Sequence, residues 1–126
     1  MNRAELNKLH TRIFESASEV YSVLGPGLDT QIYHTCFQHE LRLHGLMFKK
    51  DVLFPVIYKE IKTSHELKVE LLVENQVLVE IKNTETILQP DVTKMTSKLK
   101  ITGRKMGIII TFNASGIIEG YRKVLI

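Results

Sequence analysis

The first third of the chain shows the apolar period of two helices. Over residues 4–24, apolar residues recur every three or four positions and form one stripe: Leu6, Leu9, Ile13, Ala17, Val20 and Leu24. Gly25-Pro26-Gly27 should stop this helix. Asp29 or Thr30 can cap a second helix that runs to about residue 44, where Gly45 provides a C-terminal stop.

Strand-like patterns dominate the middle of the chain. Residues 52–58 predict a strand, and Pro55 within it indicates a sheet edge or a bulge. Residues 59–66 are polar and are expected to form a turn. Residues 67–82, LKVELLVENQVLVEIK, then read as two apolar strands joined by a short polar turn, which predicts a hairpin.

The last third predicts a crossover helix and a buried strand. Pro90 and Asp91 open a helix that runs to about residue 101 and ends at Gly103. Residues 106–112 are wholly apolar and are typical of a buried strand, whereas residues 115–123 suit a short helix or a turn. The order α-α-β-β-β-α-β predicts an α/β fold, with a mixed sheet flanked by helices and the last strand inserted after the crossover helix.

Composition narrows the class of protein. The 126 residues are 44% hydrophobic and 25% charged, as expected for one globular domain over residues 1–126. No apolar run approaches the roughly 20 residues that cross a membrane, and the N-terminus lacks the apolar stretch of a signal peptide. The single cysteine excludes an intrachain disulfide, and the five histidines form no tight ligand pattern. We expect a cytoplasmic protein without a membrane partner.

The predicted hairpin carries the candidate chemistry. Because side chains alternate along a strand, Glu80 and Lys82 share one face and Ile81 takes the other. With a three-residue turn at residues 74–76, Glu70 would lie opposite Glu80, where two carboxylates could share a cation. With a two-residue turn at residues 75–76, Glu70 would face Ile81 instead. The pattern alone leaves both registers open.

A basic segment follows the hairpin. No Asp or Glu lies between Val92 and Ile118, whereas five cations fall there: Lys94, Lys98, Lys100, Arg104 and Lys105. Together with a net charge of +3, this segment could contact a polyanion such as nucleic acid. The alternative is an ordinary solvated helix face.

The order of elements and the hairpin chemistry resemble the PD-(D/E)XK nuclease superfamily and, within it, the small bacterial GxxExxY proteins. The resemblance runs from about Val20 to Val124. It rests on several landmarks in order: Leu24-Gly25-Pro26-Gly27-Leu28, Tyr33, Glu40-Leu41-Arg42, Pro55-Val56-Ile57-Tyr58-Lys59, Leu71-Leu72-Val73-Glu74, Val79-Glu80-Ile81-Lys82, Leu99-Lys100-Ile101-Thr102-Gly103 and Phe112-Asn113.

The resemblance implies a restriction-endonuclease-like αβββαβ core and a site that hydrolyses phosphodiester bonds. Glu70 and Glu80 would then bind Mg²⁺ or Mn²⁺, with the backbone carbonyl of Ile81 as a further ligand. Lys82 would orient or deprotonate the attacking water. The expected substrate is nucleic acid, with DNA first. Domains this small often cut both strands as dimers, so a homodimer is compatible with this function.

Two catalytic positions on the N-terminal side depart from the family pattern. The name-giving glutamate falls at Thr30, beside Asp29, which could replace it, and the usual strand aspartate is Glu70. Tyr33 matches, and we expect it in the core or hydrogen-bonded near the preceding turn.

The crossover helix departs as well. The family's glutamine aligns with Lys94 and an aromatic residue aligns with Lys98. Lys94 could hold a phosphate, or it could take the place of the metal by pairing with Glu80. Three functions follow: a metal-dependent nuclease, a catalytically degenerate nucleic-acid-binding module, and a protein-interaction domain.

Overall fold

The computed structural model describes residues 1–126 and confirms the predicted order of elements up to residue 112. Its helices and strands are α1 (Arg3–Leu24), α2 (Thr30–Leu43), β1 (Phe48–Tyr58), β2 (Ile61–Val73), β3 (Val77–Lys82), α3 (Gln89–Thr102), β4 (Met106–Thr111) and β5 (Tyr121–Leu125). None of the helices is long and apolar enough to cross a membrane.

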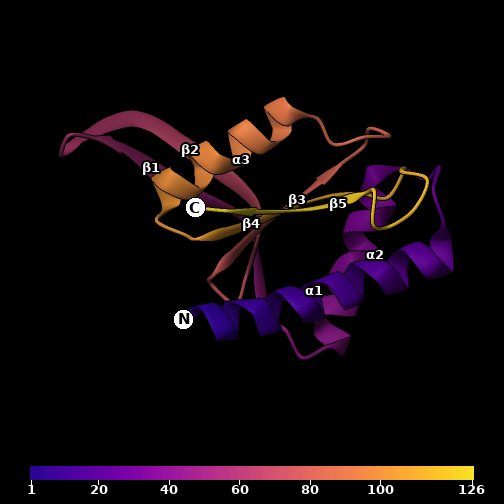
Figure 1. Cartoon of the computed structure of the whole chain (residues 1–126). Helices are drawn as coiled ribbons and strands as arrows, with labels where there is room; N and C mark the ends of the chain where they lie inside the picture. The colour runs from indigo at the N-terminus through magenta and orange to yellow at the C-terminus, as the bar shows by residue number, and fades with distance from the viewer.

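The strands form one mixed sheet in the order β1-β2-β3-β4-β5. Every neighbouring pair is antiparallel except β3 and β4, which are parallel and are joined by the crossover helix α3. Helices cover both faces: α1 and α2 lie on one side and α3 on the other (Figure 1). This is the mixed, helix-flanked architecture that the sequence predicts.

Each face of the sheet has its own apolar core. Alternation along β3 shows this directly, because Val77, Val79 and Ile81 pack with α1 and α2, whereas Leu78 packs with α3. Glu80 and Lys82 follow Leu78 at two-residue spacing and therefore belong to the α3 side. The sheet thus places the acid-x-lysine motif beneath the crossover helix.

Local sequence signals set the helix ends. The N-terminus of α1 is closed by a reciprocal capping box, in which Asn2 and Glu5 each accept from the other's backbone N–H. Pro90 lies in the first turn of α3, and Gly103 ends that helix with a left-handed φ of 69°. These ends agree with the sequence prediction to within one or two residues.

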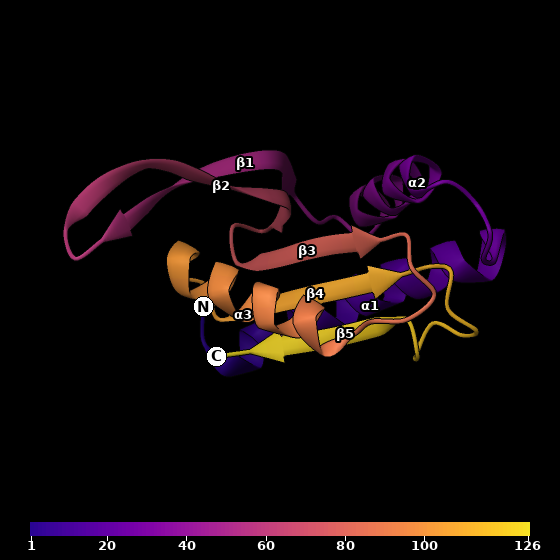
Figure 2. The ribbon, with the colours of Figure 1, turned by 90° about the horizontal axis from the view of Figure 1, so that it is seen from above.

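The hairpin of β1 and β2 is longer than the sequence predicts. Residues 59–66 were expected to form a turn, but only Lys59 and Glu60 do so, both with left-handed φ. Residues 61–66 instead belong to β2, which forms with β1 an arm that extends past α3 (Figure 2). Their polar pattern reflects exposure of this arm. The expected irregularity at Pro55 is confirmed, because the register shifts between Pro55 and Ile57 on the edge strand.

The segment predicted as a short final helix or turn ends in a strand instead. Residues 113–120 turn, and β5 then pairs antiparallel with β4. Gly120 makes the return possible, because a Cβ there would lie 2.1 Å from the Thr111 carbonyl oxygen. The backbone N–H of Thr111 donates to the Gly120 carbonyl at 2.8 Å, which fixes the entry into β5.

Candidate functional site

The hairpin between β2 and β3 adopts the three-residue turn. Leu71 pairs with Val79, and Val73 pairs with Val77, which leaves residues 74–76 as the turn. Arg104 holds it, because its guanidinium donates to the Asn75 side chain at 2.8 Å and to the Asn75 carbonyl at 3.1 Å. Regular pairing ends at Leu71 and Val79, one residue short of Glu70 and Glu80.

Glu80 is buried and carries an ion pair to the crossover helix. Its side chain is 10% exposed, and its Oε1 accepts from the Nζ of Lys98, which is 24% exposed. The sequence predicts two alternatives for Lys94, one of which is to pair with Glu80 in place of a metal. The structure gives this position to Lys98, one helical turn further along α3, and leaves Lys94 exposed.

Glu70 turns toward the opposite helix layer. Its Oε1 lies 3.2 Å from His34 Nε2 on α2 and accepts from the backbone N–H of Ile81 at 3.2 Å. Val69 and Leu71 pack in different cores although they are two residues apart, so β2 twists at Glu70. Asp51, the residue opposite on β1, has a left-handed φ of 51° and drops out of the pairing.

Lys82 pairs with the start of α3. Its Nζ lies 3.2 Å from Asp91 Oδ1, and Asp91 Oδ2 accepts from the Leu88 backbone N–H at 3.0 Å. That backbone hydrogen bond, together with Lys82 and the charge of Lys94, holds the pKa of Asp91 below its ordinary value. The motif lysine therefore helps to fix the N-terminus of the crossover helix.

The candidates at the start of α2 take different roles. Asp29 occupies the N-cap position but makes no side-chain cap hydrogen bond. Tyr33 is buried, as expected, and its hydroxyl donates to the Gly25 carbonyl and accepts from the Leu28 N–H. Thr30 lines a polar cleft beside Glu70. The turn after α1 is thus built around the Tyr33 hydroxyl.

That polar cleft lies between α2 and the β1–β2 hairpin and has a volume of about 490 Å³. Ile81 is its one apolar residue, and Asp51 and Lys68 form an ion pair at 3.6 Å on its wall. His34, one of the histidines in which the sequence shows no ligand pattern, lies here beside Glu70. His34 follows Thr30 by four residues, so both lie on one face of α2. This spacing is the sequence signal that places His34 at the same cleft.

The C-terminal ends of β3 and β4 are tied to the turn after α1. The Asn113 side chain accepts from the Gly27 N–H at 2.8 Å and donates to the Asn83 carbonyl at 3.2 Å. Thr111 on β4 also donates its hydroxyl to the Thr84 carbonyl. These bonds join the loop that follows Lys82 to the rest of the fold.

The side chains around Glu70 and Glu80 do not converge as the ligands of a divalent cation would. Carboxylates and a backbone carbonyl are suitable Mg²⁺ ligands. However, the chain nowhere gathers three His, Cys, Asp or Glu side chains that could hold a metal ion. Glu80 is neutralised by Lys98, and Glu70 is held by His34 from the other side of the sheet. As arranged, these residues do not form a metal-binding set.

The basic segment divides into two groups. Lys98 and Arg104 are engaged inside the fold, with Arg104 also stacked over the Phe54 ring at 5.2 Å. Lys94, Lys100 and Lys105 are exposed and form no ion pair. Three of the five predicted cations are therefore free to contact a polyanion.

Comparison with known families agrees with this architecture. The family model of the PD-(D/E)XK nuclease superfamily matches residues 7–124, which is nearly the whole chain. No curated protein and no solved structure gives a significant match. The narrower GxxExxY resemblance stays a prediction. Proteins of the matched superfamily generally use divalent metal ions, and the fold is restriction-endonuclease-like. The chain belongs to the PD-(D/E)XK nuclease superfamily.

Proposed function

We propose that this protein binds nucleic acid through a nuclease-type fold whose catalytic motif is closed by internal ion pairs. One observation carries the proposal: the Lys98 ammonium forms an ion pair with the Glu80 carboxylate. In a nuclease of this superfamily, that carboxylate would be a metal ligand. Here its charge is already balanced by a cation from the crossover helix.

Lys98 should win the competition with a divalent cation for the Glu80 carboxylate. A divalent ion would have to displace Lys98 from a largely buried carboxylate and leave its ammonium without a partner. Mg²⁺ also sheds its water reluctantly and needs near-ideal octahedral geometry. Glu70, engaged with His34 and the Ile81 N–H, would have to turn toward Glu80 at the same time.

Nucleic acid has a suitable surface on the same helix. Lys94 and Lys100 are exposed on α3 without acid partners, and Lys105 follows in the next loop. Cations of this kind contact phosphates without reading sequence, so binding should weaken steeply as salt concentration rises. We propose DNA as the first ligand to test.

A second candidate is Mg²⁺- or Mn²⁺-dependent hydrolysis of phosphodiester bonds. It is favoured by the position of Glu70, Glu80 and Lys82 where β2 and β3 separate, just beyond the paired Leu71 and Val79. A bound cation would supply a hydroxide and polarise the phosphate. This function requires Lys98 to release Glu80.

The test measures binding and cleavage together. Fluorescence anisotropy with labelled duplex DNA, single-stranded DNA and RNA, at several salt concentrations, should show salt-sensitive binding that is weakened in Lys94→Gln/Lys100→Gln. Lys8→Gln, an exposed lysine on α1, is the matched control. The same substrates are incubated with Mg²⁺ or Mn²⁺ and resolved by electrophoresis.

The outcomes separate the two candidates. Binding without cleavage supports the closed nuclease fold. Metal-dependent cleavage that disappears in Glu80→Gln supports the second candidate and refutes the first. No binding to any of the three nucleic acids at low salt would eliminate both.

A further inference from the structure

A second pocket lies at the end of the sheet away from the acid-x-lysine motif. It has a volume of about 410 Å³ and forms where α1 and β4 begin and β5 ends. Met106, which lines it, pairs with Val77 at the start of β3, whereas Lys82 pairs with Thr111 at the other end. Figure 2 shows both chain ends at this end of the sheet, opposite the arrowheads of β3 and β4.

Three cations from separate parts of the sequence meet at this pocket. Arg3 comes from α1, Lys105 from the loop before β4, and Lys123 from β5. No Asp or Glu side chain lines the pocket, and none of the three cations pairs with an acidic side chain. Met1 and Ile126 also line it, so the ammonium and the carboxylate of the two chain ends offset each other and the pocket stays cationic. Like charges that converge without a partner repel one another and favour an anion between them.

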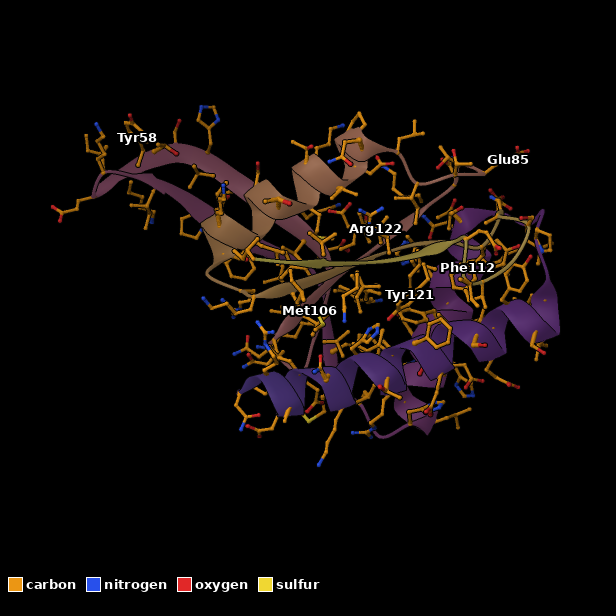
Figure 3. All side chains as sticks on the ribbon, in the orientation of Figure 1. Tyr58, Glu85, Met106, Phe112, Tyr121 and Arg122 are labelled. Atoms are coloured by element: carbon orange, nitrogen blue, oxygen red, sulfur yellow. The ribbon has the colours of Figure 1, made fainter.

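The pocket also has apolar walls. Leu6 and Met106 belong to the core between α1 and the sheet, and Leu125 is half-exposed at the rim. Figure 3 shows Met106 on the α1 side of the sheet. A cationic rim over an apolar wall fits a ligand with a charged head and an organic body, and the volume lies in the range of small-molecule sites.

We propose that this pocket binds a phosphomonoester, with the phosphate dianion held by Arg3, Lys105 and Lys123 and its organic body against the apolar wall. A phosphate ligand with two negative charges balances three cations better than a carboxylate ligand with one charge does. The arginine can also make a two-point contact with the phosphate. The same chemistry is presented by a free nucleotide and by the terminal phosphate of a nucleic-acid strand.

His10 provides an internal reporter for this site. Its Nδ1 lies 3.1 Å from the Tyr121 hydroxyl, and the Tyr121 ring also contacts Phe14 edge-on. Figure 3 shows Tyr121 on the α1 side of the sheet. Burial and the nearby charge of Lys123 lower the pKa of His10. An anion bound at Lys123 would offset that charge, so it should raise the pKa of His10.

The experiment titrates the whole chain with adenosine monophosphate, adenosine and inorganic phosphate. Calorimetry gives the affinities, and NMR of the His10 imidazole gives its pKa with and without ligand. Arg3→Gln is the test variant for both readouts, because it leaves Lys123 and therefore the reporter in place. Lys62→Gln, an exposed lysine on β2, is the matched control.

We expect adenosine monophosphate to bind more tightly than inorganic phosphate, adenosine not to bind, and the His10 pKa to rise on binding. Arg3→Gln should weaken binding about tenfold, the loss of one charge-assisted contact. Equal binding of adenosine, or unchanged affinity in Arg3→Gln, would overturn the proposal, as would no binding at millimolar ligand.

An oligonucleotide with and without a terminal phosphate distinguishes the two sources. Phosphate-dependent binding tighter than that of the nucleotide identifies a strand end as the ligand, whereas weaker binding identifies the free nucleotide. Lys105 belongs to both surfaces, but this site contains neither Lys94 nor Lys100, the residues altered in the test of nucleic-acid binding. The two sets of variants therefore separate failure of one proposal from failure of the other.

Discussion

The ion pair between Lys98 and Glu80 should contribute measurably to stability, and Lys98→Met is the change that exposes it. Methionine keeps the length and apolar stem of the side chain but leaves the Glu80 carboxylate, 10% exposed, without its cation. Removing one partner of a fully buried pair costs about 3–5 kcal/mol, whereas an exposed pair contributes about 0–1 kcal/mol. Because Lys98 is itself 24% exposed, we expect a loss of roughly 2 kcal/mol.

Thermal and urea unfolding, followed by circular dichroism at neutral pH, measure this loss. At about 2.1 cal/mol/K per residue, unfolding 126 residues changes entropy by roughly 260 cal/mol/K, so Tm should fall by about 8 °C. Glu80→Gln and the double variant complete the cycle, with an expected coupling of about 1–2 kcal/mol. Lys100→Met, two residues away and without an ion partner, should change stability little.

The same variant tests why the metal site is closed. If Lys98 excludes the metal, Mg²⁺ at ten times its dissociation constant should stabilise Lys98→Met by about 1.4 kcal/mol. The wild type should not be stabilised. A Lys98→Met protein within about 0.5 kcal/mol of wild type would show that the pair contributes little. Mg²⁺ stabilisation of the wild type would show that the pair does not exclude the metal.

Three further predictions address other parts of the fold. The pKa of Asp91 is held below its ordinary value of 3.8, so its stabilising effect should be complete above that pH and be lost as pH falls below it. At neutral pH the free energy of unfolding of Asp91→Asn should therefore be lower than that of the wild type, and it should decrease less as pH falls. The pKa of His10 is below 6.5, so the neutral ring is favoured by folding, and stability should decline as pH falls below 6.5; urea titrations of His10→Gln should lack this decline. Gly107→Ala places a Cβ 2.4 Å from Met95 Sδ and should cost about 1–3 kcal/mol by thermal unfolding.

Periodicity predicted the elements that pack against a core and missed those that do not. The α1 stripe and the apolar run of β4 were readable because burial imposes their patterns. The start of β2 has no such pattern, because its residues lie on an exposed arm that is held by backbone pairing with β1. β5 was missed for a similar reason: it is a short edge strand in which only Val124 is buried.

The sequence placed the motif residues on the correct strands but could not predict their partners. Which lysine reaches Glu80 depends on how far α3 is shifted along the sheet, because Lys94 and Lys98 are one turn apart on the same side. That shift is set where Met95 packs onto Gly107, a contact between distant segments. The turn of Glu70 toward His34 likewise depends on the distorted backbone at Asp51.

Homodimer formation stays a prediction.

The distribution of charge connects the two proposals. Three lysines beside the motif and its cleft form ion pairs within the chain: Lys98 with Glu80, Lys82 with Asp91 and Lys68 with Asp51. Lys50, which also lines the cleft, forms none. The cations around the pocket at the opposite end have no acid partner.

Because paired charges produce little field beyond their neighbours, the net charge of +3 acts chiefly from exposed cations away from the motif. A polyanion approaching this protein should therefore be drawn to α3 and to the far end of the sheet before it reaches Glu80. Removing the cation in Lys98→Met would leave the Glu80 carboxylate unbalanced, and its negative charge would repel the same ligand. A phosphate should therefore approach the opened motif only when a bound divalent ion balances Glu80, so metal binding and phosphate binding there should favour each other.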